Sequence, residues 1–144
     1  MTVLDAYAII AALLDEPAKP AVDDLLREGA PKLSAINLAE VLDKLVRGHG
    51  HDYDDVLERV YWLGAGGLEI VDPDLEIAGT AGFLRQRHYD RRTRAISMAD
   101  CFALATASIL AEPIATADPA MAAVARYEEI EMIALPDSTG RRPV

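Results

Sequence analysis

The chain is poor in the residues that form covalent cross-links and zinc sites. Its 144 residues include one cysteine, Cys101. An internal disulfide and a cysteine-rich zinc site are therefore excluded. A single cysteine suits a reducing compartment, so we expect a cytoplasmic protein.

Long apolar runs are also absent. No stretch approaches the roughly 20 apolar residues that a membrane-spanning helix needs. The early apolar segment contains Asp5 and lacks the basic start of a signal peptide. Hydrophobic residues make up 51% of the chain and charged residues 26%, as in a globular protein. We expect one soluble domain over residues 1–135 with no membrane partner, and a flexible tail over residues 136–144.

Positive charge is scarce and unevenly placed. The net charge of −10 disfavours nonspecific binding to nucleic acid, because phosphates are repelled. Five arginines nevertheless fall within residues 85–94. A solvated loop and a local basic patch on an acidic body explain this asymmetry equally well. The five are Arg85, Arg87, Arg91, Arg92 and Arg94.

Short apolar segments alternate with helical patterns along the chain. Strands are predicted near residues 2–4, 32–35, 68–71, 113–116 and 130–135. Apolar residues recur every three or four positions between them, which predicts helices. Two of these helices, over residues 37–63, form a hairpin around a glycine-rich turn. The alternation indicates an α/β domain with a mainly parallel sheet.

Asp100 lies in the first turn of a predicted helix, where it has two explanations. Ser97 and Asp100 have the spacing of a capping box, which is the commoner function of such a pair. Asp100 also lies off the apolar stripe of its helix, near the positive end of the helix dipole. Asp100 could therefore also belong to an active site, and that explanation depends on the other acidic residues.

Three further carboxylates are placed where a parallel sheet would bring them toward Asp100. Asp5 ends the first predicted strand, Asp118 follows the fourth, and Glu40 lies within the helix after the second. Asp5 and Asp118 could instead cap helices, and Glu40 could pair with Lys44 four residues later. Clustered carboxylates repel one another, and a divalent cation such as Mg²⁺ or Mn²⁺ removes that cost. Such a cation activates water and stabilises the charge on a phosphodiester.

No other catalytic pattern competes with this one. The sequence contains no Ser-His-Asp or Cys-His arrangement and no glycine-rich phosphate loop. His49 and His51 lie in a turn without a third ligand nearby, and we expect them at the surface.

Four acidic segments, taken in order, resemble the PIN-domain family, and within it the chain looks like a VapC-type toxin of bacterial toxin–antitoxin systems. The resemblance covers residues 2–135. The segments that carry it are Val3-Leu4-Asp5, Ser34-x-x-Asn37-x-x-Glu40-Val41, Ser97-x-x-Asp100 and Thr116-x-Asp118.

The resemblance implies a metal-dependent endoribonuclease that hydrolyses RNA phosphodiester bonds. It also implies a PIN-like three-layer sandwich, with a central sheet of about five strands flanked by helices. Mg²⁺ or Mn²⁺ would be the cofactor, held most directly by Asp5 and Asp100. The implied catalytic and metal-binding set is Asp5, Glu40, Asp100 and Asp118, supported by Asn37, Ser97 and Thr116.

Partners follow from the same resemblance. The implied partners are an RNA substrate, a cognate VapB-type antitoxin and a second copy in a homodimer. The hairpin over residues 37–63 is similar to the clamp that antitoxins grip, which gives Trp62 a role in binding. Arg91, Arg92 and Arg94 would supply the phosphate contacts that an acidic body lacks.

Two positions depart from the family pattern. Tyr7 stands where the family often has a small hydroxyl residue, and Met121 stands where many relatives have another acid. Either residue would reshape or weaken the metal site. The alternative to a nuclease is a non-catalytic PIN-like module that binds RNA or protein.

Overall fold

Five short strands form one parallel sheet at the centre of the molecule. The computed structural model describes residues 1–144. The spatial order of the strands is β3-β2-β1-β4-β5, and every neighbouring pair is parallel. The strands are β1 (Val3–Leu4), β2 (Lys32–Ser34), β3 (Glu69–Val71), β4 (Ile114–Thr116) and β5 (Met132–Ala134).

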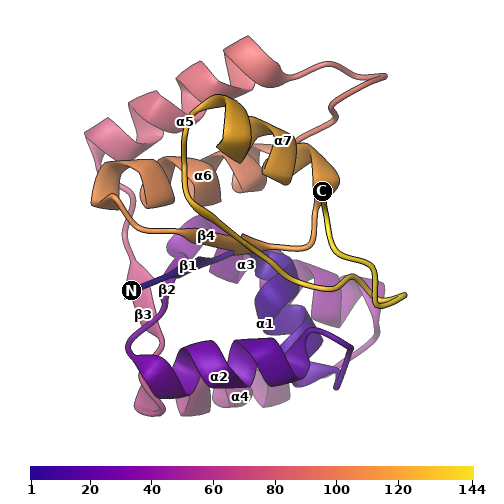
Figure 1. The fold of residues 1–144 in the computed structure, drawn as a ribbon. Coiled ribbons are helices and arrows are strands. Elements are labelled where there is room, and N and C mark those ends of the chain that lie inside the picture. The colour runs from indigo at the N-terminus through magenta and orange to yellow at the C-terminus, as the bar shows by residue number, and fades with distance from the viewer.

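Helices cover both faces of this sheet, so the predicted three-layer α/β sandwich is confirmed (Figure 1). One layer holds α1 (Ala6–Leu13), α2 (Lys19–Glu28), α3 (Ala35–Asp43) and α4 (Tyr53–Ala65). The other layer holds α5 (Leu75–His88), α6 (Met98–Leu110) and α7 (Pro119–Tyr127). No helix is both long and apolar enough to cross a membrane.

The central strands separate two hydrophobic cores. Leu4 and Ala115 belong to the core beneath α1–α4, while Val3 and Ile114 belong to the core beneath α5–α7. This division arises because successive side chains of a strand point to opposite faces. All four residues are buried, as expected of a parallel sheet covered on both sides.

Two helical features go beyond the sequence prediction. α5 begins at Leu75, because Asp74 is its N-cap and accepts a 2.9 Å hydrogen bond from Ile77 N. After α3 the chain continues as a π-helical turn, η1 (Lys44–Gly48), instead of remaining α-helical. The spacing of apolar residues gives no signal for such a widened turn.

Residues 136–144 turn back after β5 and end beside the start of α7 (Figure 1). The carbonyl oxygen of Pro136 accepts a 3.2 Å hydrogen bond from the Tyr7 hydroxyl. Asp137 Oδ1 accepts from the backbone nitrogens of Thr139 and Arg141. These contacts give the segment a defined turn, and its flexibility in solution stays a prediction.

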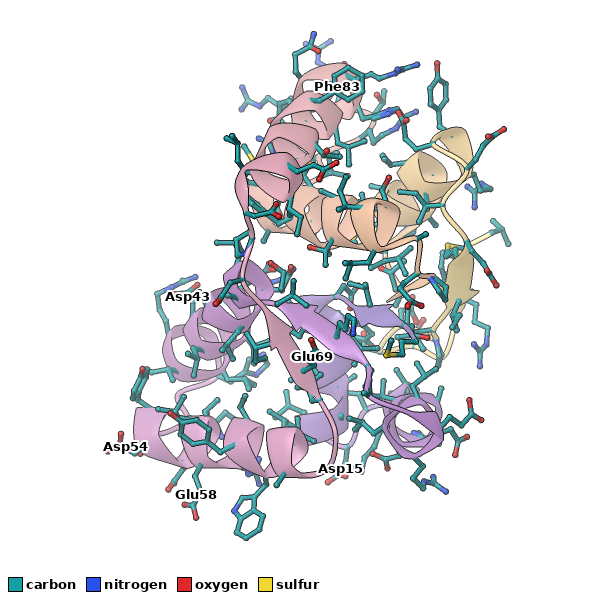
Figure 2. All side chains as sticks on the ribbon, turned by 90° about the vertical axis from the view of Figure 1, so that its left-hand side faces the viewer. Asp15, Asp43, Asp54, Glu58, Glu69 and Phe83 are labelled. Carbon is teal, nitrogen blue, oxygen red and sulfur yellow. The ribbon has the colours of Figure 1, made fainter.

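Negative charge is spread over the surface. Figure 2 shows Asp43 of α3, Asp54 and Glu58 of α4 and Glu69 of β3 on the side where β3 forms the edge of the sheet. Phe83 of α5 lies at the top of the same view and is half-exposed. The acidic character of the chain therefore extends well beyond the candidate carboxylates.

Candidate functional site

Two of the four candidate carboxylates lie just beyond the carboxyl ends of central strands, and the other two lie on helices near them. Asp5 follows β1 and caps α1, and Asp118 lies two residues after β4 and caps α7. Asp100 is in the first turn of α6, and Glu40 lies on α3, which follows β2. Parallel strands thus bring Asp5 and Asp118 to one edge of the sheet, and Asp100 lies close enough for its charge to act on Asp5.

Asp5 is the most enclosed of the four, with 3% of its surface exposed. Its Oδ1 accepts a 2.8 Å hydrogen bond from Ala8 N, and its Oδ2 accepts one of 2.6 Å from Thr116 Oγ1. Burial raises the pKa of Asp5 to about 7, although both hydrogen bonds oppose the rise. The negative charges of Asp100 and Asp118 raise this pKa further. Burial therefore favours the neutral form of Asp5, and the two hydrogen bonds partly offset that preference.

Asp100 forms the capping box that its spacing predicts. Ser97 Oγ accepts a 3.0 Å hydrogen bond from Asp100 N, and Asp100 Oδ2 accepts one of 2.6 Å from Ser97 N. Burial raises the pKa of Asp100 against these two bonds, and the charges of Glu40 and Asp118 add to the rise. Asp100 therefore caps its helix and also lies close to other carboxylates.

Asp118 is fixed by the start of α7. Its Oδ1 accepts hydrogen bonds from Ala120 N at 2.6 Å and Met121 N at 3.1 Å. Met121 is buried, and its sulfur lies 3.6 Å from Thr116 Oγ1. The thioether therefore packs beside the hydroxyl that holds Asp5, where many relatives are expected to have an acid.

Glu40 and Asn37 bring unsatisfied oxygens to the same region. Glu40 Oε1 forms a 2.7 Å ion pair with Lys44 Nζ, while its Oε2 is buried without a hydrogen-bond partner. Asn37 is fully buried, and its Nδ2 donates to Ala99 O of α6 over 3.2 Å. Asn37 Oδ1 also lacks a partner. Native proteins leave few such acceptors unpaired, and a water or an ion commonly satisfies them.

The carboxylates influence one another, but they do not surround a single point. No group of three His, Cys, Asp or Glu side chains is placed to hold one metal ion. Each carboxylate is instead held by its own helix cap or by Lys44. An ion enclosed by all four side chains does not fit this arrangement.

The donor set does suit Mg²⁺ or Mn²⁺ bound through a few carboxylates and water. These cations prefer hard oxygen ligands, and Mg²⁺ commonly keeps several waters while binding one or two carboxylates. Glu40 Oε2 is a free buried acceptor of this kind. The residues present therefore fit a partly hydrated cation.

The arginine-rich loop between α5 and α6 is only partly free to bind a ligand. Arg94 Nη1 lies 3.0 Å from His88 Nδ1, and because arginine can only donate, Nδ1 is the acceptor. The side chains of Arg91 and Arg92 are exposed and make no ion pair. Asp90 Oδ1 shapes the loop by accepting from the backbone nitrogens of Arg92 and Thr93. Two of the three predicted RNA contacts are thus uncommitted.

Tyr7 and the two histidines can now be placed. The Tyr7 hydroxyl contacts Glu16 Oε2 at 3.0 Å as well as Pro136 O, so its polar end is engaged with these groups rather than with Asp5. His49 and His51 are exposed, as predicted. The predicted pairing of Lys44 with Glu40 is confirmed by their 2.7 Å ion pair.

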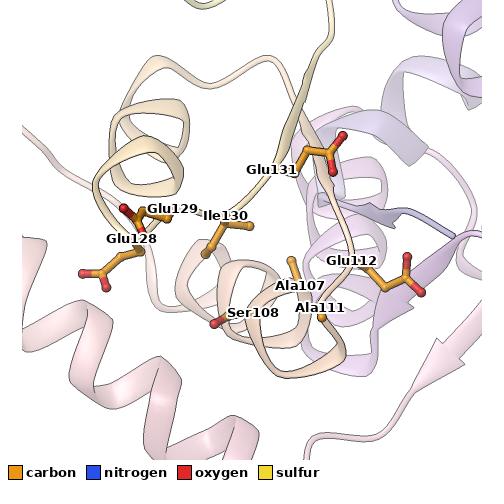
Figure 3. Close-up of a pocket in the computed structure, with 8 residues that line it drawn as sticks. All are labelled: Ala107, Ser108, Ala111, Glu112, Glu128, Glu129, Ile130 and Glu131. Atoms are coloured by element: carbon orange, nitrogen blue, oxygen red, sulfur yellow. The ribbon is translucent and has the colours of Figure 1, made fainter.

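A separate pocket lies at the far end of α6 (Figure 3). It encloses about 280 Å³ and has four glutamates among its lining residues. Glu112 pairs with the N-terminal amine at 2.8 Å, and Glu128 contacts His88 and Arg87. α6 extends about 20 Å at 1.5 Å per residue, so this pocket is remote from Asp100. It does not belong to the candidate site.

Comparison with protein families yields one match. The PIN domain model matches residues 2–127. A comparison with curated proteins finds no match.

Similar folds occur among solved structures. FitAcB from Neisseria gonorrhoeae is 24% identical with a TM-score of 0.62, covering 92% of this chain and 96% of that one. VapBC2 from Rickettsia felis, bound to a DNA fragment from its promoter, is 15% identical with a TM-score of 0.66, covering 92% and 96%. VapC20 of Mycobacterium tuberculosis, a Sarcin-Ricin loop cleaving toxin, is 16% identical with a TM-score of 0.66, covering 85% and 94%. At these identities the similarity shows the fold.

Proposed function

Since the chain belongs to the PIN-domain family, we propose that it is a metal-dependent endoribonuclease that hydrolyses RNA phosphodiester bonds. The observation that carries the proposal is the gathering of Asp5, Asp100 and Asp118 at the carboxyl edge of a parallel sheet, where the charges of Asp100 and Asp118 raise the pKa of the buried Asp5. Each of these residues caps a helix, but helix capping alone does not require repelling carboxylates to lie close together. A reaction that requires a divalent cation explains why these carboxylates lie close together.

The proposed roles follow from how each side chain is held. Asp5 and Asp100 would be the most direct ligands of a partly hydrated Mg²⁺ or Mn²⁺, and Glu40 and Asp118 would contribute to the metal site through water bound to the ion. When bound, such a cation activates water and stabilises the charge that develops on a phosphodiester.

The supporting residues keep these carboxylates in place. Thr116 favours the ionised form of Asp5 by donating a hydrogen bond to it. Ser97 fixes the rotamer of Asp100 through the capping box. Asn37 ties α3 to α6 by donating to Ala99 O, and so sets the distance between Glu40 and Asp100.

We further propose that the protein is the toxin of a toxin–antitoxin pair, acts in the cytoplasm and forms a homodimer. Several solved structures with the same fold are VapBC or FitAB complexes, which supports a VapB-type antitoxin as partner. Tyr61 and Trp62 on α4 are 69% and 70% exposed. Large exposed aromatic side chains on one helix are typical of a protein-binding surface.

A non-catalytic module that binds RNA or protein is the second candidate. It is favoured by the absence of any three acidic, histidine or cysteine side chains placed around one metal position. The two candidates differ in their response to Mn²⁺. A nuclease site predicts that Mn²⁺ raises the melting temperature of the wild type and promotes discrete cleavage of a labelled mixture of structured RNAs, both abolished by EDTA. A melting temperature indifferent to Mn²⁺, with no cleavage, would favour the binding module.

A further inference from the structure

A polar groove lies next to the candidate carboxylates, between α1, η1 and the C-terminal segment. Its volume is about 290 Å³. That is close to the lower end of the range for small-molecule sites, which is about 300 Å³. The polar residues that line it are Tyr7, Glu16, Lys44, Arg47, His49 and Ser138.

Lys44 connects this groove to the carboxylates. Its Nζ lies 2.7 Å from Glu40 Oε1, yet 51% of its side chain is exposed. The charges of Asp100 and Asp5 also act on Lys44, so its ammonium group lies within reach of their fields. Tyr7 also links the groove to the carboxylates, because it lines the groove and follows Asp5 by two residues in the first turn of α1. The groove therefore borders the carboxylate cluster at Lys44.

Two of the residues that line the groove are positively charged and one is negatively charged. Lys44 and Arg47 carry positive charge and Glu16 carries the one negative charge. Arg47 is paired with Asp43 at 2.8 and 2.7 Å, but its side chain is 74% exposed. An exposed ion pair contributes little to stability, so Arg47 can change partners at small cost.

The π-helical turn accounts for this concentration of charge. η1 carries Lys44 and Arg47 within its five residues. His49 N bonds to Lys44 O across the widened turn at 3.1 Å. π-Helical turns are rare and are frequent at functional sites, because they are less stable than α-helix and need a compensating use. Here the turn holds two cations beside the acidic edge of the sheet.

We propose that this groove binds a phosphate of the RNA strand adjacent to the phosphodiester at the carboxylates, with Arg47 and Lys44 as its contacts. The proposal rests on the nuclease function proposed above. An RNA strand that places one phosphate at four carboxylates must place the next phosphate near them, in a strongly repulsive field. Lys44 and Arg47 supply positive charge at that position. Tyr7 and Ser138 also line the groove.

Arg47→Met and Arg27→Met form a matched pair for the test. Both arginines are exposed, by 74% and 72%, and each is paired with an aspartate on its own helical segment. Arg27 lies on α2 and does not line the groove. Lys44→Met provides a second groove variant, and Lys44→Arg retains its charge.

The measurement is the affinity for a short fluorescent single-stranded RNA in EDTA over a series of salt concentrations. The proposal predicts that Arg47→Met and Lys44→Met weaken binding and reduce the slope of log affinity against log salt by about 0.7 each, the value for one lost contact with a single strand. Arg27→Met and Lys44→Arg should keep the wild-type slope. A purely structural role for Lys44 would not change this slope.

Two other outcomes would overturn the proposal in different ways. If the wild type binds and cleaves RNA while Arg47→Met and Lys44→Met keep its affinity and slope, the groove is not a phosphate site and the nuclease function stands. If the wild type neither binds nor cleaves RNA, the nuclease proposal and the groove proposal both fail.

Discussion

The hydroxyl of Thr116 donates a 2.6 Å hydrogen bond to Asp5 Oδ2, joining the carboxyl ends of β4 and β1. Thr116 Oγ1 in turn accepts a 3.0 Å hydrogen bond from Asp118 N. One buried side chain therefore positions two of the four candidate carboxylates. A charge-assisted bond of this kind is shorter and stronger than one between neutral groups.

Replacing Thr116 by valine should destabilise the protein by about 1–3 kcal/mol, because the buried Asp5 carboxylate loses a hydrogen bond. Urea denaturation at pH 8 in EDTA measures this difference. Thr106→Val is the matched control, since the buried Thr106 hydroxyl donates only to Phe102 O within α6. Equal losses of stability in the two variants would show that the Thr116–Asp5 bond has no special weight.

Stability in EDTA should fall as pH rises from about 4 to about 7. The pKa of Asp5 is about 7 in the folded state and 3.8 for the ordinary carboxyl group. Between these values the folded protein retains a proton that the unfolded chain has lost. The stabilisation is complete below the lower value and is lost above the higher one, amounting to at most about 4 kcal/mol. Asp100, whose pKa is also raised, acts in the same direction.

Urea midpoints measured across this pH range for wild type and Asp5→Asn test the expectation. Asparagine remains a good N-cap for α1 but does not titrate. The variant should therefore show a flatter dependence on pH. A wild-type stability that rises over the same range would contradict the assigned pKa.

The three loop arginines should separate into two groups. Arg91→Ala and Arg92→Ala should each reduce the salt dependence of RNA binding by about 0.7 with little change in stability, because their side chains have no partners. Arg94→Ala should lower the melting temperature as well, since it removes the donor to buried His88. Fluorescence titrations and thermal melts distinguish these effects. Identical behaviour of all three variants would show that the contact with His88 is not formed.

The sequence predicted the sheet edge well because parallel strands leave little choice. Asp5 and Asp118 follow β1 and β4, which lie side by side and pair in parallel, so their arrival at one edge depends only on strand direction. The position of Asp100 at the start of α6 could be predicted from the capping box, which forms as the spacing of Ser97 and Asp100 predicts. These are local features, and the three-layer fold preserves them.

Features that depend on tertiary packing could not be predicted from the sequence. The near-complete burial of Asp5 arises from layers on both sides of the sheet, which no single segment encodes. The contact of Arg94 with His88 joins residues on opposite sides of a loop, and the π-helical turn after Asp43 has no apolar periodicity of its own. The exposure of Trp62 likewise differs from the edge-of-core packing that is its usual place.

The most direct test of the central claim is the initial rate of RNA cleavage in Mn²⁺ by wild type, Asp100→Asn and Asp74→Asn. Both substitutions exchange an aspartate at a helix N-terminus for its neutral analogue, but Asp74 caps α5, away from the carboxylate edge. The account predicts that wild type and Asp74→Asn cleave at similar rates, that EDTA abolishes both, and that Asp100→Asn is inactive while remaining folded. Undiminished cleavage by Asp100→Asn, or cleavage that persists in EDTA, would contradict it.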